Sequence, residues 1–94
     1  MGYSRMPTVH RAGNLRFVVF VDDHGLPHVH VFEGRGEAKL LLGAPGGRPS
    51  LVWARGFDRA SLRRVMQETL SRRAKLLAAW RRVHGPQEGG REQG

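Results

Sequence analysis

The sequence predicts an α+β domain in which an antiparallel sheet of four or five strands packs on one long C-terminal helix. Five short β-prone segments come first, and one long segment with a helical period follows them. Strands and a helix that are segregated in this way favour separate layers over a parallel sheet with crossover helices. A chain of 94 residues is long enough for one hydrophobic core. We therefore expect a single domain over residues 6–84, between a flexible N-terminal extension (1–5) and a disordered tail (85–94).

The strands are predicted from runs of β-branched and aromatic residues that are bounded by turn residues. Residues 15–21 are apolar on nearly both faces, which predicts a central strand. Residues 28–33 and 37–42 flank a glycine-rich turn and form a predicted hairpin. The remaining segments are assigned from their glycine and proline residues and from their position in the chain: an edge strand at 7–11, a loop at 43–50 and a fifth strand at 51–54.

A helix is predicted over residues 58–84. Asp58 is a suitable N-cap because its carboxylate can accept hydrogen bonds from the first turn, and Gly85-Pro86 is a stop signal. A helix of this length would extend about 40 Å, so a kink or a break near Ser71 is an alternative. Its apolar residues follow the 3.6-residue period of an amphipathic helix: Leu62, Val65, Met66, Thr69, Leu70, Leu76, Leu77 and Trp80.

The stretch Asp22-Asp23-His24-Gly25-Leu26-Pro27-His28-Val29-His30 carries the strongest functional signal. It contains three of the chain's five histidines. Because side chains alternate along a strand, His28 and His30 share one face at a separation of roughly 6.5–7 Å. His24, on the incoming loop, can fold back toward them. Imidazole ionises near neutral pH, so we predict a shared site for proton transfer or for metal binding.

The formal net charge of +8 indicates an acidic partner, either nucleic acid or an acidic protein. Eight basic residues against two acidic ones over 58–84 supply +6 of it. Arg73 falls within the apolar stripe, where an unpaired guanidinium is too costly to bury. The helix therefore breaks near it, or Arg73 meets a carboxylate, or it reaches toward a ligand. For the other basic residues of the helix, the alternative is a solvent-exposed face without a partner. The nucleic-acid-binding candidates are Arg63, Arg64, Arg72, Arg73, Arg81 and Arg82.

Composition excludes several classes of function. With no cysteine, the chain has no disulfides, no thiolate nucleophile and no zinc–sulfur site. Because no apolar run approaches the ~20 residues that cross a bilayer, we expect a soluble cytoplasmic protein without membrane partners.

The histidine motif, the opening Met6-Pro7-Thr8-Val9 and the segment Gly36-Glu37-Ala38-Lys39 together resemble a family of small bacterial proteins, a domain of unknown function (DUF family 4160). That family usually reads Asn-Asp-His-x-Pro-Pro-His-x-His, so Asp22 replaces an asparagine here and Leu26 replaces the first proline. Its members are often encoded beside a second small protein as a presumed toxin–antitoxin pair. The resemblance covers residues 6–84 and implies a small acidic cognate protein as a partner.

Three functions fit these features. The first is a metal-independent ribonuclease toxin, with His28 and His30 as base and acid and with His24 and Asp23 beside them. Arg16, Arg35 or Arg73 would then stabilise the charge that develops at phosphorus. The second is a metal site, with zinc held by residues drawn from Asp22, His24, His28 and His30. The third is a non-enzymatic module that binds nucleic acid, RNA more readily than DNA, or a protein through the basic helix.

Overall fold

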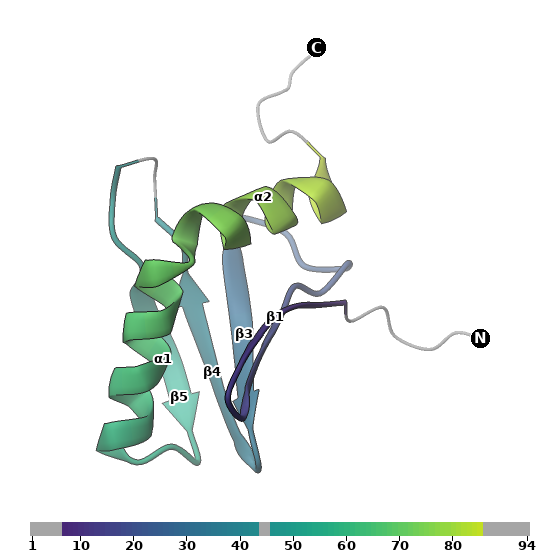
Figure 1. Ribbon diagram of the computed structural model, residues 1–94. Helices are drawn as coiled ribbons and strands as arrows, with labels where there is room; N and C mark the ends of the chain where they lie inside the picture. The colour runs from purple at the N-terminus through teal and green to yellow at the C-terminus, as the bar shows by residue number, and fades with distance from the viewer. Residues whose placement is uncertain (1–6, 44–45, 86–94) are drawn as a thin grey trace, which may run out of the picture.

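The computed structural model describes residues 7–43 and 46–85 (Figure 1). The predicted N-terminal extension at 1–5 lies outside these residues, as does the predicted tail from residue 86 onward. One sheet forms the centre of the structure, and two helices follow it in the chain. The predicted α+β class is thus confirmed.

Five antiparallel strands form the sheet in chain order, from β1 at one edge to β5 at the other. They are β1 (Thr8–Ala12), β2 (Leu15–Val18), β3 (His28–Glu33), β4 (Gly36–Leu41) and β5 (Ser50–Arg55). The strand β2 is shorter than the predicted 15–21, because its pairing with β3 ends where Val18 meets His30. The chain then leaves the sheet, and the ring of Phe20 lies 4.7 Å from that of His30.

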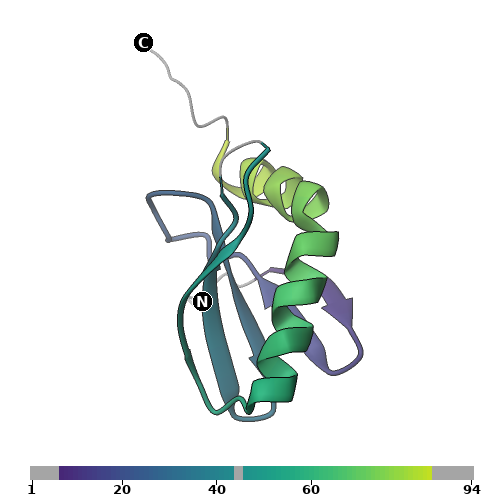
Figure 2. The same cartoon turned by 90° about the vertical axis from the view of Figure 1, so that its left-hand side faces the viewer.

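The register of the strands separates the two faces of the sheet. Phe17, Val31, Ala38 and Ala54 lie opposite one another on adjacent strands and face the helices. The residues next to them in each strand point to the other face. Figure 2 shows both helices on one side of β3 and β4, and no helix of the described residues lies on the opposite side. The sheet therefore has one covered face and one face without a helix.

The predicted single helix is two helices, α1 (Arg59–Ser71) and α2 (Arg73–His84). Asp58 caps α1 as predicted, since its Oδ1 accepts a hydrogen bond of 2.7 Å from the backbone N–H of Ser61. Arg72 lies between the helices with φ −106° and ψ 17°, and α2 turns across the end of the sheet (Figure 1). The break near Ser71, which the helix length suggested, is therefore present.

The length of the strands explains why the helix bends. A straight helix of the predicted length would extend about 40 Å, whereas a six-residue strand extends about 20 Å. The second half would project beyond the sheet and expose its apolar residues. The bend lets Leu76, Leu77 and Trp80 join the core, where each is less than one-tenth exposed. The hydroxyl of Thr69, which donates to the carbonyl of Val65 at 2.7 Å, is a contact that often accompanies helix bending.

The expectation that Leu70 packs in the core is wrong, because its side chain is 44% exposed. Leu70 is the penultimate residue of α1. The change of direction at Arg72 leaves it outside the buried side of the helix, where Val65 and Thr69 lie. It lines a surface cavity with Pro49 and Met66. Within the described residues, neither helix is long and apolar enough to cross a membrane.

Candidate metal centre

Asp23, His28 and His30 meet at one end of β3. The Oδ2 atom of Asp23 lies 2.7 Å from Nε2 of His28 and 3.4 Å from Nε2 of His30. The two imidazole rings are 5.5 Å apart between centroids. A backbone hydrogen bond of 3.2 Å from the N–H of Asp23 to the carbonyl of Phe20 holds the loop in a turn that brings the carboxylate over the strand.

The ring of His28 is fixed on both sides and almost fully buried, at 3% exposure. Its Nδ1 lies 2.9 Å from the backbone carbonyl of Leu26. Since a carbonyl only accepts, Nδ1 carries the proton and donates, which leaves Nε2 facing Asp23. The ring of Trp80 from α2 packs 4.9 Å away between centroids. The bend between the helices thus places a buried side chain directly behind a site residue.

The ring of His30 is oriented by a second carboxylate. Its Nδ1 donates to Oε2 of Glu37 at 3.2 Å, and Oε1 of Glu37 accepts from the guanidinium of Arg55 at 2.7 Å. Burial lowers the pKa of His30 below its ordinary value of 6.5, although the nearby charges of Asp23 and Glu37 act in the opposite direction. A lowered pKa favours the neutral imidazole, whose Nε2 then offers a lone pair toward Asp23.

The three side chains meet the geometric requirements of a metal site. Their ligand atoms all lie within 4.8 Å of one another. Two ligand atoms on a tetrahedral zinc ion lie roughly 3.3 Å apart, given zinc–ligand distances of about 2.05 Å. The 3.4 Å between His30 and Asp23 matches this spacing. The 2.7 Å between His28 and Asp23 is a hydrogen bond, and an ion would replace the proton between these two atoms with a modest increase in their separation.

The residues matched by a family model include Asp23, His28 and His30. Residues 14–81 match the model of a domain of unknown function (DUF4160). The chain belongs to this family. No curated protein and no solved structure matches it. The match runs from the turn before β2 into α2, so it covers Asp23, His28, His30 and Trp80.

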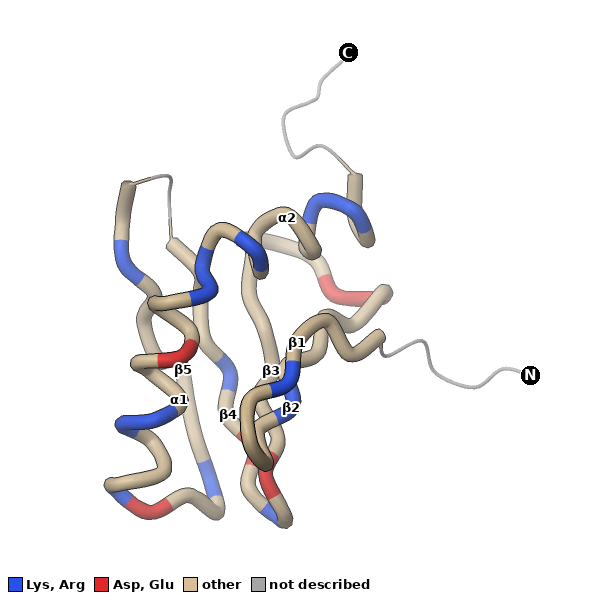
Figure 3. Tube along the Cα trace, in the orientation of Figure 1, with Lys and Arg blue, Asp and Glu red and all other residues tan. Residues whose placement is uncertain are grey.

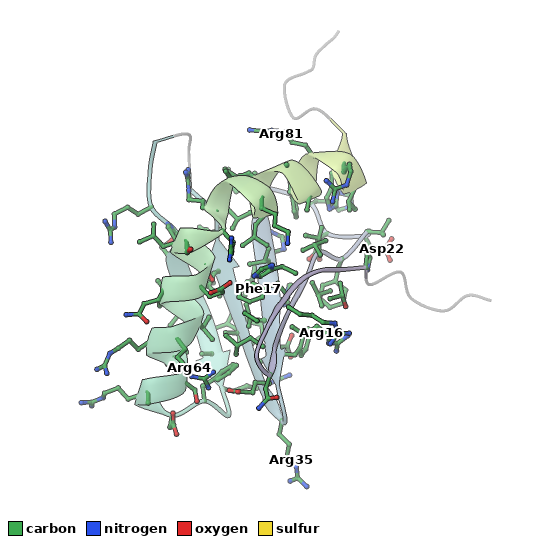
Figure 4. All side chains as sticks on the ribbon, viewed as in Figure 1. Arg16, Phe17, Asp22, Arg35, Arg64 and Arg81 are labelled. Atoms are coloured by element: carbon green, nitrogen blue, oxygen red, sulfur yellow. The ribbon has the colours of Figure 1, made fainter. Side chains whose placement is uncertain are left out.

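The structure does not bring all the predicted site residues of this DUF4160 domain together. His24 and Asp22 are exposed on the loop before β3, and neither belongs to the group of possible metal ligands among the described residues. Arg35 lies in the turn at the opposite end of the hairpin from Asp22, as Figure 4 shows. The guanidinium of Arg16 lies over the ring of Phe32, 5.2 Å from its centroid.

The arginines predicted to bind nucleic acid are scattered over the two helices of the DUF4160 domain, as Figure 3 shows. Arg64 pairs with Glu33 at 3.0 Å, and Arg72 pairs with Glu68 at 3.4 Å. Arg73 is half-buried and donates from Nε to the carbonyl of Leu42, so it reaches the sheet rather than a carboxylate at this contact. Arg63, Arg81 and Arg82 are exposed.

Two residues of the site were not assigned from the sequence. Glu37 orients His30 and Arg55 holds Glu37, and both are supplied by neighbouring strands. The signal for Glu37 was the predicted hairpin itself, because Phe32 lies directly opposite Glu37 and His30 is then its diagonal neighbour. Arg55 lies opposite Glu37 on β5, a pairing that only the register of β4 with β5 fixes.

A second polar cluster, made of His10, Glu68 and Lys75, lies elsewhere in the DUF4160 domain and joins β1 to the two helices. Lys75 donates to Nδ1 of His10 at 2.9 Å, so Nε2 of that ring donates to Glu68 at 2.6 Å. This hydrogen bond from His10 holds the pKa of Glu68 below its ordinary value of 4.5. Both ring nitrogens of His10 are engaged within this cluster, which indicates a structural role.

Proposed function

We propose that this protein binds one divalent transition-metal ion, zinc by preference, and uses it to cleave phosphodiester bonds in RNA. The ligands are Nε2 of His28, Nε2 of His30 and the carboxylate of Asp23. One observation carries the proposal: both rings direct Nε2 at the same carboxylate while an acceptor engages each Nδ1. Metal-binding histidines have this arrangement, in which the acceptor fixes the tautomer and the orientation of the ring.

Asp23 favours a metal centre over a metal-independent acid–base pair. Its carboxylate lies where both Nε2 atoms converge, which is the position that a scissile phosphate would occupy between a histidine base and a histidine acid. An uncompensated carboxylate at that point repels a phosphodiester. A bound cation reverses this effect, because it offsets the charge of Asp23 and attracts the phosphate.

Three protein ligands leave one position of a tetrahedral ion open. A zinc ion held in this way would activate water and polarise a phosphoryl oxygen. The chain's own residues position the ligands: the Leu26 carbonyl and Glu37 fix the two rings, and Trp80 supports His28 from behind.

RNA is the substrate that the charge of the chain favours, at +8 over 94 residues. The role that accords with the presumed toxin–antitoxin pairing of the family is a ribonuclease toxin. In that role the protein acts in the cytoplasm, and a small acidic cognate protein covers its basic surface. Expression of the chain alone should then arrest growth, and expression of the Asp23→Asn variant should not.

Zinc stoichiometry tests the metal site. Protein purified without a histidine tag and stripped with chelator should bind one equivalent of zinc, and the absence of cysteine removes competing thiolates. The variants Asp23→Asn and His28→Ala should lose this equivalent. Asp22→Asn and His24→Ala are matched controls from the same motif and should keep it. Equal zinc binding by all five proteins would overturn the proposed ligand set.

RNA cleavage tests the activity. We expect the zinc-loaded protein to cleave a mixed-sequence RNA, chelator to stop the reaction, and added zinc to restore it. Cleavage that continues in chelator and depends on His28 and His30 would instead identify the metal-independent mechanism. Absence of cleavage by fully loaded protein would identify a binding module.

A further inference from the structure

The face of the sheet without a helix carries a group of aromatic and basic side chains beside the metal centre. The register places them in two rows across the strands, Val18–His30–Lys39–Trp53 and Arg16–Phe32–Glu37–Arg55. We call Arg16, Phe32, Lys39, Trp53 and Arg55 the open-face group. Because directly paired residues share a face, the register places all five on the face of the sheet opposite the helices.

Cations and aromatic rings alternate within the open-face group. The guanidinium of Arg16 lies 5.2 Å from the centroid of Phe32, and that of Arg55 lies 5.6 Å from the centroid of Trp53. Trp53 is 38% exposed, on an edge strand that contributes little to the core. Its ring is 6.0 Å from that of His30, between centroids. The group therefore adjoins a metal ligand directly.

We propose that the open-face group binds single-stranded RNA, with bases stacked on Trp53 and Phe32 and with phosphates on Arg16 and Lys39. This inference rests on the proposed function, since it names the form of RNA that reaches the metal centre. Aromatic platforms interleaved with cations bind single strands because an unpaired base offers a free face for stacking. Sheets with exposed aromatic residues bind RNA in this way, whereas a duplex keeps its bases within its own stack.

Charge complementarity favours nucleic acid as the occupant of this face. The open-face group contains three cations, and Glu37, the one carboxylate in the two rows, is held by Arg55 and His30. Two of the helix arginines are engaged by glutamates at the protein surface. These contacts favour the sheet over the helices as the surface that binds phosphates.

Fluorescence anisotropy with a labelled ten-nucleotide oligouridylate tests the proposal. The titration is run in chelator, because stacking needs no ion and binding is then separate from cleavage and from zinc content. Trp53→Ala should weaken affinity about fivefold or more. Trp53→Phe keeps a stacking ring, so its loss of affinity on a logarithmic scale should be less than half that of Trp53→Ala. Leu51→Ala is the matched control on the same strand, since Leu51 is also exposed and apolar. It should stay within twofold of the native affinity.

Quenching of tryptophan emission gives an independent readout of stacking. Trp80 is buried, so quenching by oligouridylate should come from Trp53 and should disappear in Trp53→Phe. A duplex of equal length should bind more weakly and should not distinguish Trp53→Ala from native protein. If the protein fails to bind zinc but still binds oligouridylate in chelator, the proposed metal centre is wrong and the open-face proposal is supported.

Four results would overturn the inference. In the first, Trp53→Ala binds within twofold of native protein. In the second, RNA affinity falls fivefold or more in a triple variant of the exposed helix arginines (Arg63→Gln, Arg81→Gln, Arg82→Gln) but not in Trp53→Ala. In the third, light scattering shows that native protein is a dimer and that Trp53→Ala is a monomer, which would assign the open face to a second copy of the chain. Tighter binding of an equal-length oligodeoxythymidylate would overturn the assignment to RNA.

Discussion

The function of each histidine in the triad depends on which ring nitrogen is already engaged. Nδ1 of His28 donates to a backbone carbonyl and Nδ1 of His30 donates to Glu37, so both Nε2 atoms face the carboxylate of Asp23. His10 differs, because Lys75 donates to its Nδ1 and its Nε2 contacts only Glu68. The first arrangement suits the proposed metal site, and the second suits a structural contact.

The second carboxylate of the centre supplies a prediction. Glu37→Ala removes the acceptor that orients His30 and should weaken zinc affinity about tenfold to a hundredfold while the stoichiometry stays at one. Glu37→Gln keeps an oxygen acceptor and should weaken it less. Competition with a zinc-binding dye measures both, and Glu33→Gln is the control, since Glu33 pairs with Arg64 away from the centre. Equal affinities for Glu37→Ala and Glu33→Gln would show that Glu37 does not position the ligand.

Among the elements, β1 and the helices are joined through Glu68, and this contact should depend on pH. The pKa of Glu68 is lowered in the folded protein, first by the hydrogen bond from His10. A lowered carboxyl pKa stabilises the fold above the unfolded value near 4.5 and loses that contribution as the pH falls through the folded value. Native protein should therefore exceed Glu68→Gln in urea midpoint at pH 7, and the difference should shrink at pH 3. In a His10→Ala background the pH dependence of this difference should be smaller, the remainder coming from Arg72, and an undiminished pH dependence would exclude His10 as the main cause.

The position of α2 depends on Trp80, which gives a second prediction for an element. Trp80→Ala should lower the free energy of unfolding by about 3–5 kcal/mol, because it removes a large, fully buried side chain, and Trp80→Phe should cost less. Trp53→Ala is the matched control, since its ring is partly exposed, and it should cost clearly less than Trp80→Ala. Guanidinium denaturation followed by circular dichroism measures all three. Equal losses at the two tryptophans would contradict the assigned core.

The elements also show which features the sequence could predict. The β3–β4 hairpin, the cap at Asp58 and the buried face of Ala38, Leu40 and Leu42 follow from local patterns, and the structure has all three. The break at Arg72 depends on the length of the sheet beneath it. The carboxylate at the centre depends on how the loop folds over β3, so that Asp23 rather than Asp22 reaches the two histidines. Features set by packing between distant segments therefore do not follow from local sequence patterns.

For the whole molecule, the distribution of charge supplies a prediction. Phosphate contacts by Arg16 and Lys39 should give a log–log dependence of RNA affinity on salt with a slope of roughly −1.4, at about −0.7 per phosphate contact on a single strand. The double variant Arg16→Gln, Lys39→Gln leaves the contact between Arg55 and Glu37 in place and should bring this slope close to zero. The variant of Arg63, Arg81 and Arg82 should keep the native slope. Anisotropy titrations over a salt series measure these slopes, and the reverse pattern would place the phosphates on the helices.

The two faces of the molecule have separate tasks in this account. The helices and the covered face supply the core and support His28 from behind, and the opposite face presents the metal centre and the open-face group. The position of a bound ion tests the central claim most directly. In crystals grown with zinc, an anomalous difference map at the zinc absorption edge should contain a peak about 2.0–2.2 Å from Nε2 of His28, Nε2 of His30 and a carboxylate oxygen of Asp23. A fully loaded crystal with no peak there, or with its zinc at His10 or His24 instead, would contradict the account.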